Sequence, residues 1–206
     1  DYLGLNGSLG LELDSQDSIS IEFTVQGAYP VGWIDFYVKP AFGPSDSLPT
    51  DFSLGQAALS GFVKIGDDGG IYVLNGDGFG NGEWVDSGYV VVLNGDVAAN
   101  WVRMTYRLDY SSRLWDLFLD EQLQVIDLGF VDPNAPPLKG FSIAGASVGE
   151  TYFDQFTARF FNPLFIDVDN DGIPDAYELA QGMDTTLDDR DADRDFDSIL
   201  NVREYM

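Results

Sequence analysis

The sequence predicts an all-β protein: an antiparallel β-sandwich followed by a small C-terminal appendage. Three observations predict the sandwich. Apolar and polar residues alternate along short segments of residues 1–162. Asn-Gly, Asp-Gly and Pro-rich stretches, which favour turns, separate these segments. No helical period of apolar residues appears among them, and many short strands at this spacing are typical of antiparallel sandwiches.

The alternation is clearest in two segments. In residues 18–26, Ile19 and Ile21 share one face and Ser20 lies on the other. Residues 101–110 repeat this pattern, which predicts a second strand with one buried face. Further strands are expected at residues 32–39, 57–65, 70–75, 88–93, 114–119, 122–127, 138–144 and 151–161.

The composition excludes several classes of function. The chain has 206 residues, with 35 acidic and 10 basic side chains and a net charge of −25. With no basic stripe to neutralise phosphates, nucleic acid is not expected as a partner. No run of about 18 apolar residues occurs, so no membrane insertion is expected. The absence of cysteine and histidine excludes thiolate nucleophiles, Ser-His-Asp triads and Cys/His zinc sites, and leaves oxygen ligation of hard cations.

The composition changes at Pro163, and residues 167–206 hold 13 acidic and 3 basic side chains. Residues 167–178 read D-V-D-N-D-G-I-P-D-A-Y-E, with acids at positions 1, 3, 5, 9 and 12. A calcium loop has this spacing because alternate side chains converge on one ion, glycine at position 6 allows a sharp turn, and position 7 offers its carbonyl. The expected ligands are Asp167, Asp169, Asp171, the carbonyl of Ile173, Asp175 and Glu178.

A second loop begins 26 residues later. Ser198 stands in place of the glycine, and we expect it to strain the turn and weaken the site. The acids between the loops, Asp184, Asp188, Asp189 and Asp191, could add ligands, but we expect them mainly on the solvated surface. Short helices are expected at residues 174–181 and 199–205, with Gly182 ending the first. The expected ligands of the second loop are Asp193, Asp195, Asp197, the carbonyl of Ile199, Asn201 and Glu204.

The alternative interpretation of both loops is a solvated acidic tail that keeps the protein soluble. Five carboxylates within twelve residues would repel one another strongly without a cation, so we favour calcium at the first loop. The loops resemble the thrombospondin type 3-like and dockerin-like calcium-binding repeats of bacterial secreted proteins. They differ from an EF-hand because no helix enters the first loop and the hydrophobic residue is at position 7.

The remaining chain resembles a concanavalin A-like (laminin G-like) jelly roll. Residues 19–25, 101–109, 114–120 and 152–158 carry this resemblance through strand order and aromatic placement. It implies a jelly-roll sandwich over residues 1–162 and a calcium-binding appendage over residues 163–206. Such sandwiches serve as glycan binders, adhesion modules or glycanases, and the fold alone does not choose among these functions.

Catalysis is not expected. The related glycanases carry E-x-D-x-x-E on a strand, and this pattern is absent. Asp116 and Asp120 share a face of one predicted strand and are interpreted as a surface pair. The glycine-rich residues 76–82 lack the helix and lysine of a phosphate loop, so a long hairpin loop is expected there.

Glycan binding would require exposed aromatic faces. Trp33, Trp84, Trp101 and Trp115, with Tyr37 and Tyr89, are the candidates, and core packing is the alternative for each. Trp84 is expected to be the most exposed of them because it follows the glycine-rich stretch.

These observations predict a secreted, calcium-stabilised, non-enzymatic protein. We expect a structural or adhesion subunit of an extracellular or cell-surface assembly, such as a filament, with copies of itself or other surface components as partners. A carbohydrate-binding (lectin-like) module is the alternative. The leucine-rich residues 1–13 are expected to pair within their own sheet or, alternatively, to add to a neighbour's sheet edge. Asp1 in place of Met is expected to reflect removal of a signal peptide.

Overall fold

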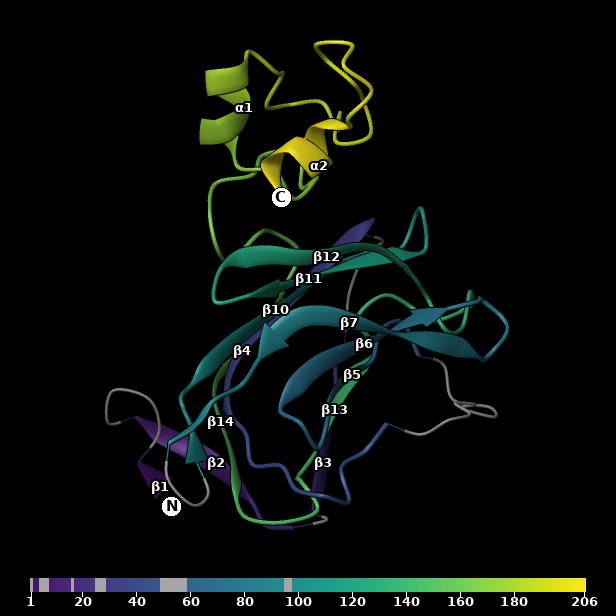
Figure 1. The fold of residues 1–206 in the computed structure, drawn as a ribbon. Helices are drawn as coiled ribbons and strands as arrows, with labels where there is room; N and C mark the ends of the chain where they lie inside the picture. The colour runs from purple at the N-terminus through teal and green to yellow at the C-terminus, as the bar shows by residue number, and fades with distance from the viewer. Residues whose placement is uncertain (1, 4–7, 16, 25–28, 49–58, 95–97) are drawn as a thin grey trace.

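A computed structural model describes residues 2–3, 8–15, 17–24, 29–48, 59–94 and 98–206 (Figure 1). All the strand pairs are antiparallel, so the prediction of an all-β antiparallel sandwich with two short helices is confirmed. The strands are β1 (Tyr2–Leu3), β2 (Leu9–Leu13), β3 (Ser18–Glu22), β4 (Val31–Lys39), β5 (Val63–Ile65), β6 (Gly70–Gly76), β7 (Gly82–Val90), β8 (Leu93–Asn94), β9 (Ala98–Ala99), β10 (Val102–Asp109), β11 (Leu114–Leu119), β12 (Gln122–Gly129), β13 (Gly140–Ala144) and β14 (Thr151–Arg159); the helices are α1 (Asp175–Gln181) and α2 (Asn201–Tyr205).

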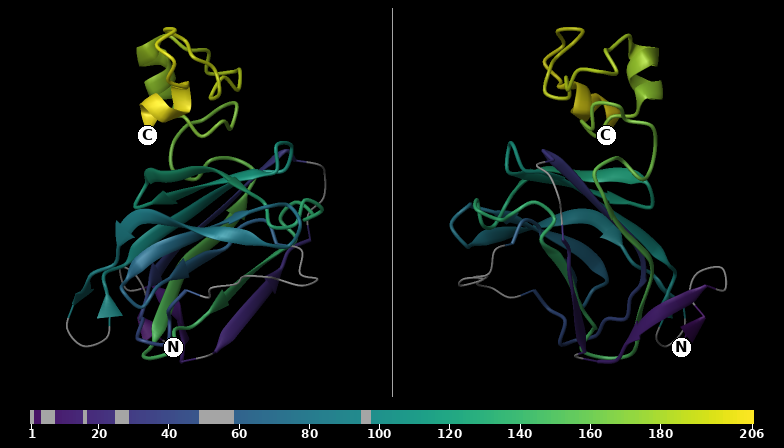
Figure 2. Two further views of the ribbon diagram at one scale, coloured as in Figure 1. Left: turned by 45° about the vertical axis from the view of Figure 1, so that its right-hand side comes forward. Right: turned by 180° about the vertical axis from the view of Figure 1, so that it is seen from behind.

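One large sheet forms the base of the sandwich. Its seven strands run in the order β1-β2-β14-β4-β10-β11-β12. Two smaller sheets, β13–β3 and β5–β6–β7, lie over its inner face, as Figures 1 and 2 show. Strand β3 pairs with β13, which follows it by more than 100 residues. This small sheet therefore forms only when segments far apart in the sequence come together.

The main core lies between these sheets. Phe36 of β4 stacks near Tyr106 of β10, with ring centroids 5.9 Å apart, and Phe141 of β13 packs against both rings from the facing sheet. These inward side chains alternate along their strands, as the period of two predicted.

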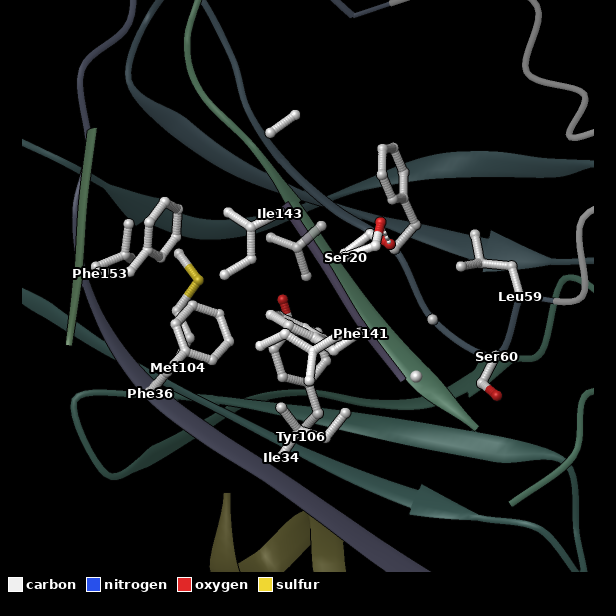
Figure 3. Close-up of a pocket in the computed structure, with 18 of the residues that line it drawn as sticks. Ser20, Ile34, Phe36, Leu59, Ser60, Met104, Tyr106, Phe141, Ile143 and Phe153 are labelled. Atoms are coloured by element: carbon white, nitrogen blue, oxygen red, sulfur yellow. Dashed lines mark hydrogen bonds between the residues drawn. The ribbon is translucent and has the colours of Figure 1, made fainter. Parts of the chain in front are cut away.

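A cavity of about 760 Å³ remains between the sheets (Figure 3). Phe36, Met104 and Tyr106 of the large sheet line one side of it, and Phe141 and Ile143 of β13 line another. The walls are mostly apolar, but polar side chains such as Ser20, Ser60 and Ser142 also line the cavity and offer hydrogen-bonding groups.

The outer face of the large sheet is covered too. The alternation in residues 101–110 predicted one buried face, yet Thr105 and Arg107 on the other face are also buried. The C-terminal segment covers this outer face. Figure 1 shows its helices α1 and α2 at the top, above β12 and β11. A second hydrophobic core joins the two parts, in which Trp33 and Phe118 of the sheet pack with Ile173 and Val202 of the segment.

Several predictions about individual segments are confirmed. Gly182 ends α1 with φ of 73°, in the left-handed region. The glycine-rich stretch lies between the paired strands β6 and β7, as a hairpin loop. Strand β2 pairs with β14, so the N-terminal segment pairs within its own sheet.

Strand β7 begins earlier than the predicted strand at residues 88–93. Residues 25–26, 49–58 and Leu5 lie outside the described residues.

Candidate metal centre

The first predicted loop gathers three of its acids at one point. The carboxylates of Asp167, Asp169 and Asp171 each offer an oxygen, and these oxygens lie within 4.8 Å of one another. Backbone N–H groups of the loop donate hydrogen bonds to these carboxylates and fix their orientation. Gly172 N donates to Asp167 Oδ2 at 3.2 Å, and Ile173 N donates to Asp171 Oδ1 at 2.8 Å. The sharp turn at Gly172 has φ of 95°, which explains the glycine at position 6.

Helix α1 places Glu178 next to Asp171, with oxygens of the two carboxylates within 4.8 Å of each other. The Glu178 side chain is 0% exposed, and neither of its carboxylate oxygens has a hydrogen-bond partner among the described residues. Asp169 Oδ2 and Asp171 Oδ2 are likewise buried without a partner there. A buried carboxylate without compensation is strongly unfavourable. Four such oxygens in two neighbouring acidic groups therefore form a candidate site for a cation.

The pKa values of Glu178, Asp171 and Asp169 are all raised, because these acids are buried close to one another. Burial raises the pKa of Glu178 to about 8, and repulsion from Asp169 and Asp171 contributes. Burial also raises the pKa of Asp171 to about 7 and the pKa of Asp169 to about 6. A cation at this point would reverse these shifts because it stabilises the ionised carboxylates.

The structure places two other acids differently from the sequence expectation. Asp189, which was expected on the solvated surface, is half-buried, and one of its oxygens lies within 4.8 Å of oxygens of Asp171 and Glu178. Asp175, an expected ligand, is in neither oxygen group. Its Oδ1 accepts a hydrogen bond from Val168 N at 3.0 Å. This bond connects the start of the first loop to the start of α1.

The donor set suits a hard cation. Calcium binds six to eight oxygens at about 2.3–2.6 Å, so two ligand oxygens of one ion lie at most about 5 Å apart. The two overlapping oxygen groups meet this limit and share Asp171. The identity of the ion as calcium stays a prediction.

The second loop repeats the first in backbone geometry. Ser198 N donates to Asp193 Oδ2 at 2.9 Å, and Ile199 N donates to Asp197 Oδ1 at 2.8 Å. Oxygens of Asp193, Asp195 and Asp197 lie within 4.8 Å of one another. Ser198 has φ of 77°, the left-handed region that favours glycine, which is the strain that the sequence predicted. This loop is more exposed than the first.

The last two expected ligands of the second loop are not in its oxygen group. The Asn201 side chain is buried and directed toward Asp189: its Nδ2 donates to the carbonyl of Asp189 at 2.8 Å and to Asp189 Oδ1 at 3.2 Å. Glu204 is exposed, and its pKa is raised, first by desolvation and then by repulsion from Asp195 and Asp197.

Two arginines fasten the first loop to the sheet. Arg107 Nε of β10 donates to the carbonyl of Asn170 at 2.8 Å, and Arg190 Nη1 donates to the carbonyl of Asp171 at 2.9 Å. Both guanidinium groups contact Asp116 Oδ2, at 3.3 and 2.7 Å. The interpretation of Asp116 as a surface acid is therefore wrong. It is 2% exposed because the C-terminal segment covers it, whereas Asp120 is exposed.

None of the six aromatic candidates is fully exposed, and Tyr37, Tyr89 and Trp101 are half-buried. Trp33 and Trp115 are fully buried, which confirms the core-packing alternative for these two. Trp84 is half-buried, with its ring 5.7 Å from that of Phe62, so it is not the exposed residue that we expected. A third group of acids, Glu12, Asp14 and Glu150, is exposed where β2 ends and β14 begins.

No protein-family model and no curated protein matches this chain. Among solved structures, an HCR/D mutant aligns with a TM-score of 0.51 and 12% identity over 87% of this chain and 45% of its own. A sialidase aligns with a TM-score of 0.51 and 11% identity over 86% of this chain and 17% of its own. A botulinum neurotoxin type C structure, whose cell entry is described as dependent on two ganglioside molecules, aligns with a TM-score of 0.47 and 9% identity over 72% of this chain and 38% of its own.

The first two matches show the sandwich fold. This chain spans less than half of either matched chain, and identities this low concern the fold alone. In the part of the chain that the structure describes, no helix has the length and apolar character needed to cross a membrane.

Proposed function

We propose that this chain is a secreted, calcium-binding β-sandwich module in which an ion at the first loop holds the C-terminal segment on the sheet. The observation that carries the proposal is Glu178, which is fully buried with both carboxylate oxygens unpartnered among the described residues. Asp171 lies beside it with a buried, unpartnered oxygen of its own. A cation would satisfy these oxygens without protonation.

The ion would act on the sandwich through the loop backbone. The carbonyls of Asn170 and Asp171 accept hydrogen bonds from Arg107 and Arg190, and Asn170 Oδ1 accepts one from Trp33 Nε1 at 3.3 Å. A loop that repels itself without calcium would loosen these contacts. Calcium binding is thus coupled to the docking of the C-terminal segment.

Thermal unfolding with and without calcium tests this proposal. Calcium should raise the melting temperature of the wild-type protein, and Glu178→Gln should abolish most of that rise. Asp188→Asn is the matched control, because Asp188 is exposed and belongs to neither oxygen group. An equal rise in wild type and Glu178→Gln would contradict the proposal. Limited proteolysis after Pro163 should accelerate in EDTA.

Glycan binding is the second candidate function. Its support is the sialidase match, a protein that acts on a carbohydrate and shares the sandwich fold at a TM-score of 0.51. The inter-sheet cavity combines apolar walls with the hydroxyl groups of Ser20, Ser60 and Ser142, so both it and the outer surface are candidate sugar sites. A glycan array probed in millimolar calcium and again in EDTA tests it, and no signal above an unrelated acidic protein would reject it.

The role as a subunit of an extracellular assembly has less support. Strand β2 is already paired with β14, so residues 9–13 are not a free strand for a neighbour's sheet, and in the N-terminal segment only β1, at the edge of the large sheet, is paired on one side alone among the described residues. Light scattering at high protein concentration in millimolar calcium distinguishes the two roles. A monomer there would leave the glycan-binding module as the favoured function of the sandwich.

A further inference from the structure

Asp189 lies outside both twelve-residue motifs, yet its carboxylate reaches the first loop. An oxygen of Asp189 lies within 4.8 Å of oxygens of Asp171 and Glu178. Because Glu178 is fully buried and unpartnered among the described residues, an ion bound by Glu178 lies within reach of Asp189 as well.

The second loop holds Asp189 in this position. Asn201, the first residue of α2, donates from Nδ2 to both the carbonyl and the Oδ1 of Asp189. Asn201 Oδ1 in turn accepts a hydrogen bond from Arg194 N at 3.2 Å, so both polar atoms of this buried amide are hydrogen-bonded. Asn201 therefore serves the first site, although its position in the motif predicted a role in the second.

Backbone hydrogen bonds reinforce the connection. Asn201 N donates to the carbonyl of Ala192 at 2.8 Å, and Val202 N donates to the carbonyl of Arg190 at 3.0 Å. The start of α2 is thus fixed to residues 189–192. That start is also the end of the second loop, whose Ile199 N donates to Asp197 Oδ1. Ordering the second loop orders the segment that carries Asp189.

We propose that Asp189 is a ligand of the ion at the first loop and that Asn201 positions it, so that the two loops bind their ions as one cooperative unit. The inference rests on the proposed calcium function. The binding of an ion at the second loop raises the affinity of the first site, and by thermodynamic reciprocity the converse holds. Asn201 is a positioning residue, and Asp189 is the ligand.

Calorimetric titration with calcium tests the ligand. Asp189→Asn should weaken the first site about 10-fold or more, whereas the matched control Asp188→Asn should stay within about 2-fold of wild type. Asn201→Ala should weaken it by about 10- to 100-fold, the usual effect of losing a residue that orients a ligand. Wild-type affinity in Asp189→Asn, with binding lost in Glu178→Gln, would overturn this inference and leave the calcium function standing. Unchanged binding in Glu178→Gln would overturn the calcium function itself.

A thermodynamic cycle tests the coupling. The double variant Asp193→Asn/Asp195→Asn, which disables the second loop, should weaken calcium binding at the first loop in the wild-type background. In the Asn201→Ala background the same double variant should cause no further weakening, because the connection is already broken. A purely structural role of Asn201 would leave the two effects additive, and additive effects would overturn the coupling.

A crystal structure with bound calcium keeps the inference testable if a variant fails to fold. A distance from the ion at the first loop to a carboxylate oxygen of Asp189 of about 2.3–2.6 Å is expected. A separation beyond about 3.5 Å would overturn the assignment of Asp189.

Discussion

Arg190 Nη1 lies 2.7 Å from Asp116 Oδ2, and this ion pair joins the C-terminal segment to the outer face of the large sheet. Both side chains are almost fully buried, and Arg107 contacts the same oxygen from β10 at 3.3 Å. The arginines also bind the backbone of the first loop, so Asp116 links the strand to the metal centre. The segment is therefore part of the folded unit.

Asp116→Ala should destabilise the protein by about 3–5 kcal/mol, because it leaves Arg107 and Arg190 buried without their shared carboxylate. Asp191→Ala is the control, since this carboxylate is 73% exposed and lies 3.9 Å from Arg190 Nε. It should change stability by less than about 1 kcal/mol. Urea denaturation in saturating calcium measures both, and equal effects of the two substitutions would contradict the role of Asp116.

The metal-free protein should become less stable as the pH rises. The folded pKa values of about 6 for Asp169, 7 for Asp171 and 8 for Glu178 exceed the unfolded values near 4. The folded state therefore binds more protons between about pH 4 and pH 8, and its stability falls through this range as those protons leave. Melting temperatures in EDTA should be lower at pH 8 than at pH 5.5.

Calcium should remove or reverse this dependence. The ion binds the deprotonated carboxylates, so its stabilisation should grow as the pH rises from 5.5 to 8. The same melting series in millimolar calcium measures it. A metal-free protein that gained stability with rising pH would contradict the placement of these three buried acids.

Ser198→Gly should strengthen the second loop. Ser198 has φ of 77°, which costs a residue with a side chain about 1–2 kcal/mol, and glycine removes this strain. Greater freedom of glycine in the unfolded chain offsets part of the gain, so a net stabilisation of about 0.5–1 kcal/mol is expected. Thermal unfolding in calcium measures it.

Gly172→Ala, the reverse change in the first loop, should destabilise. Gly172 has φ of 95°, and an added Cβ would lie 3.2 Å from Arg107 Cδ. A stable Gly172→Ala protein with unchanged calcium affinity would argue against the loop geometry described above.

The chain should show no glycosidase activity. It has no histidine or cysteine and no E-x-D-x-x-E pattern, and the buried Asp116 is neutralised by two arginines. Release of reducing sugar from β-glucans and of sialic acid from a sialylated substrate should both equal the boiled control. Release above that control would show a catalytic site that the sequence does not reveal.

Local patterns in the sequence predicted much of this fold. Strands β3 and β10 show a period of two, and the loop at residues 167–178 shows its ligand spacing directly. The partners of these elements could not be predicted in the same way. Arg190 meets Asp116 across 74 positions, and β3 meets β13 across more than 100, so no local period encodes either contact.

The candidate site was predictable where the motif is continuous. Asp167, Asp169, Asp171 and Glu178 follow from spacing alone. Asp189 was considered as an additional ligand but was expected on the solvated surface, because the sequence does not show that the chain reversal after α1, which the left-handed Gly182 allows, brings it back to Glu178. Asn201 was assigned to its own loop because the sequence does not show that its amide faces Asp189.

Calcium titration by isothermal calorimetry tests the central claim most directly. The wild-type protein should bind two ions, and Glu178→Gln should lose the ion at the first loop while Asp188→Asn keeps both. The absence of calcium binding to the wild-type protein at millimolar concentration, or full binding by Glu178→Gln, would contradict the account.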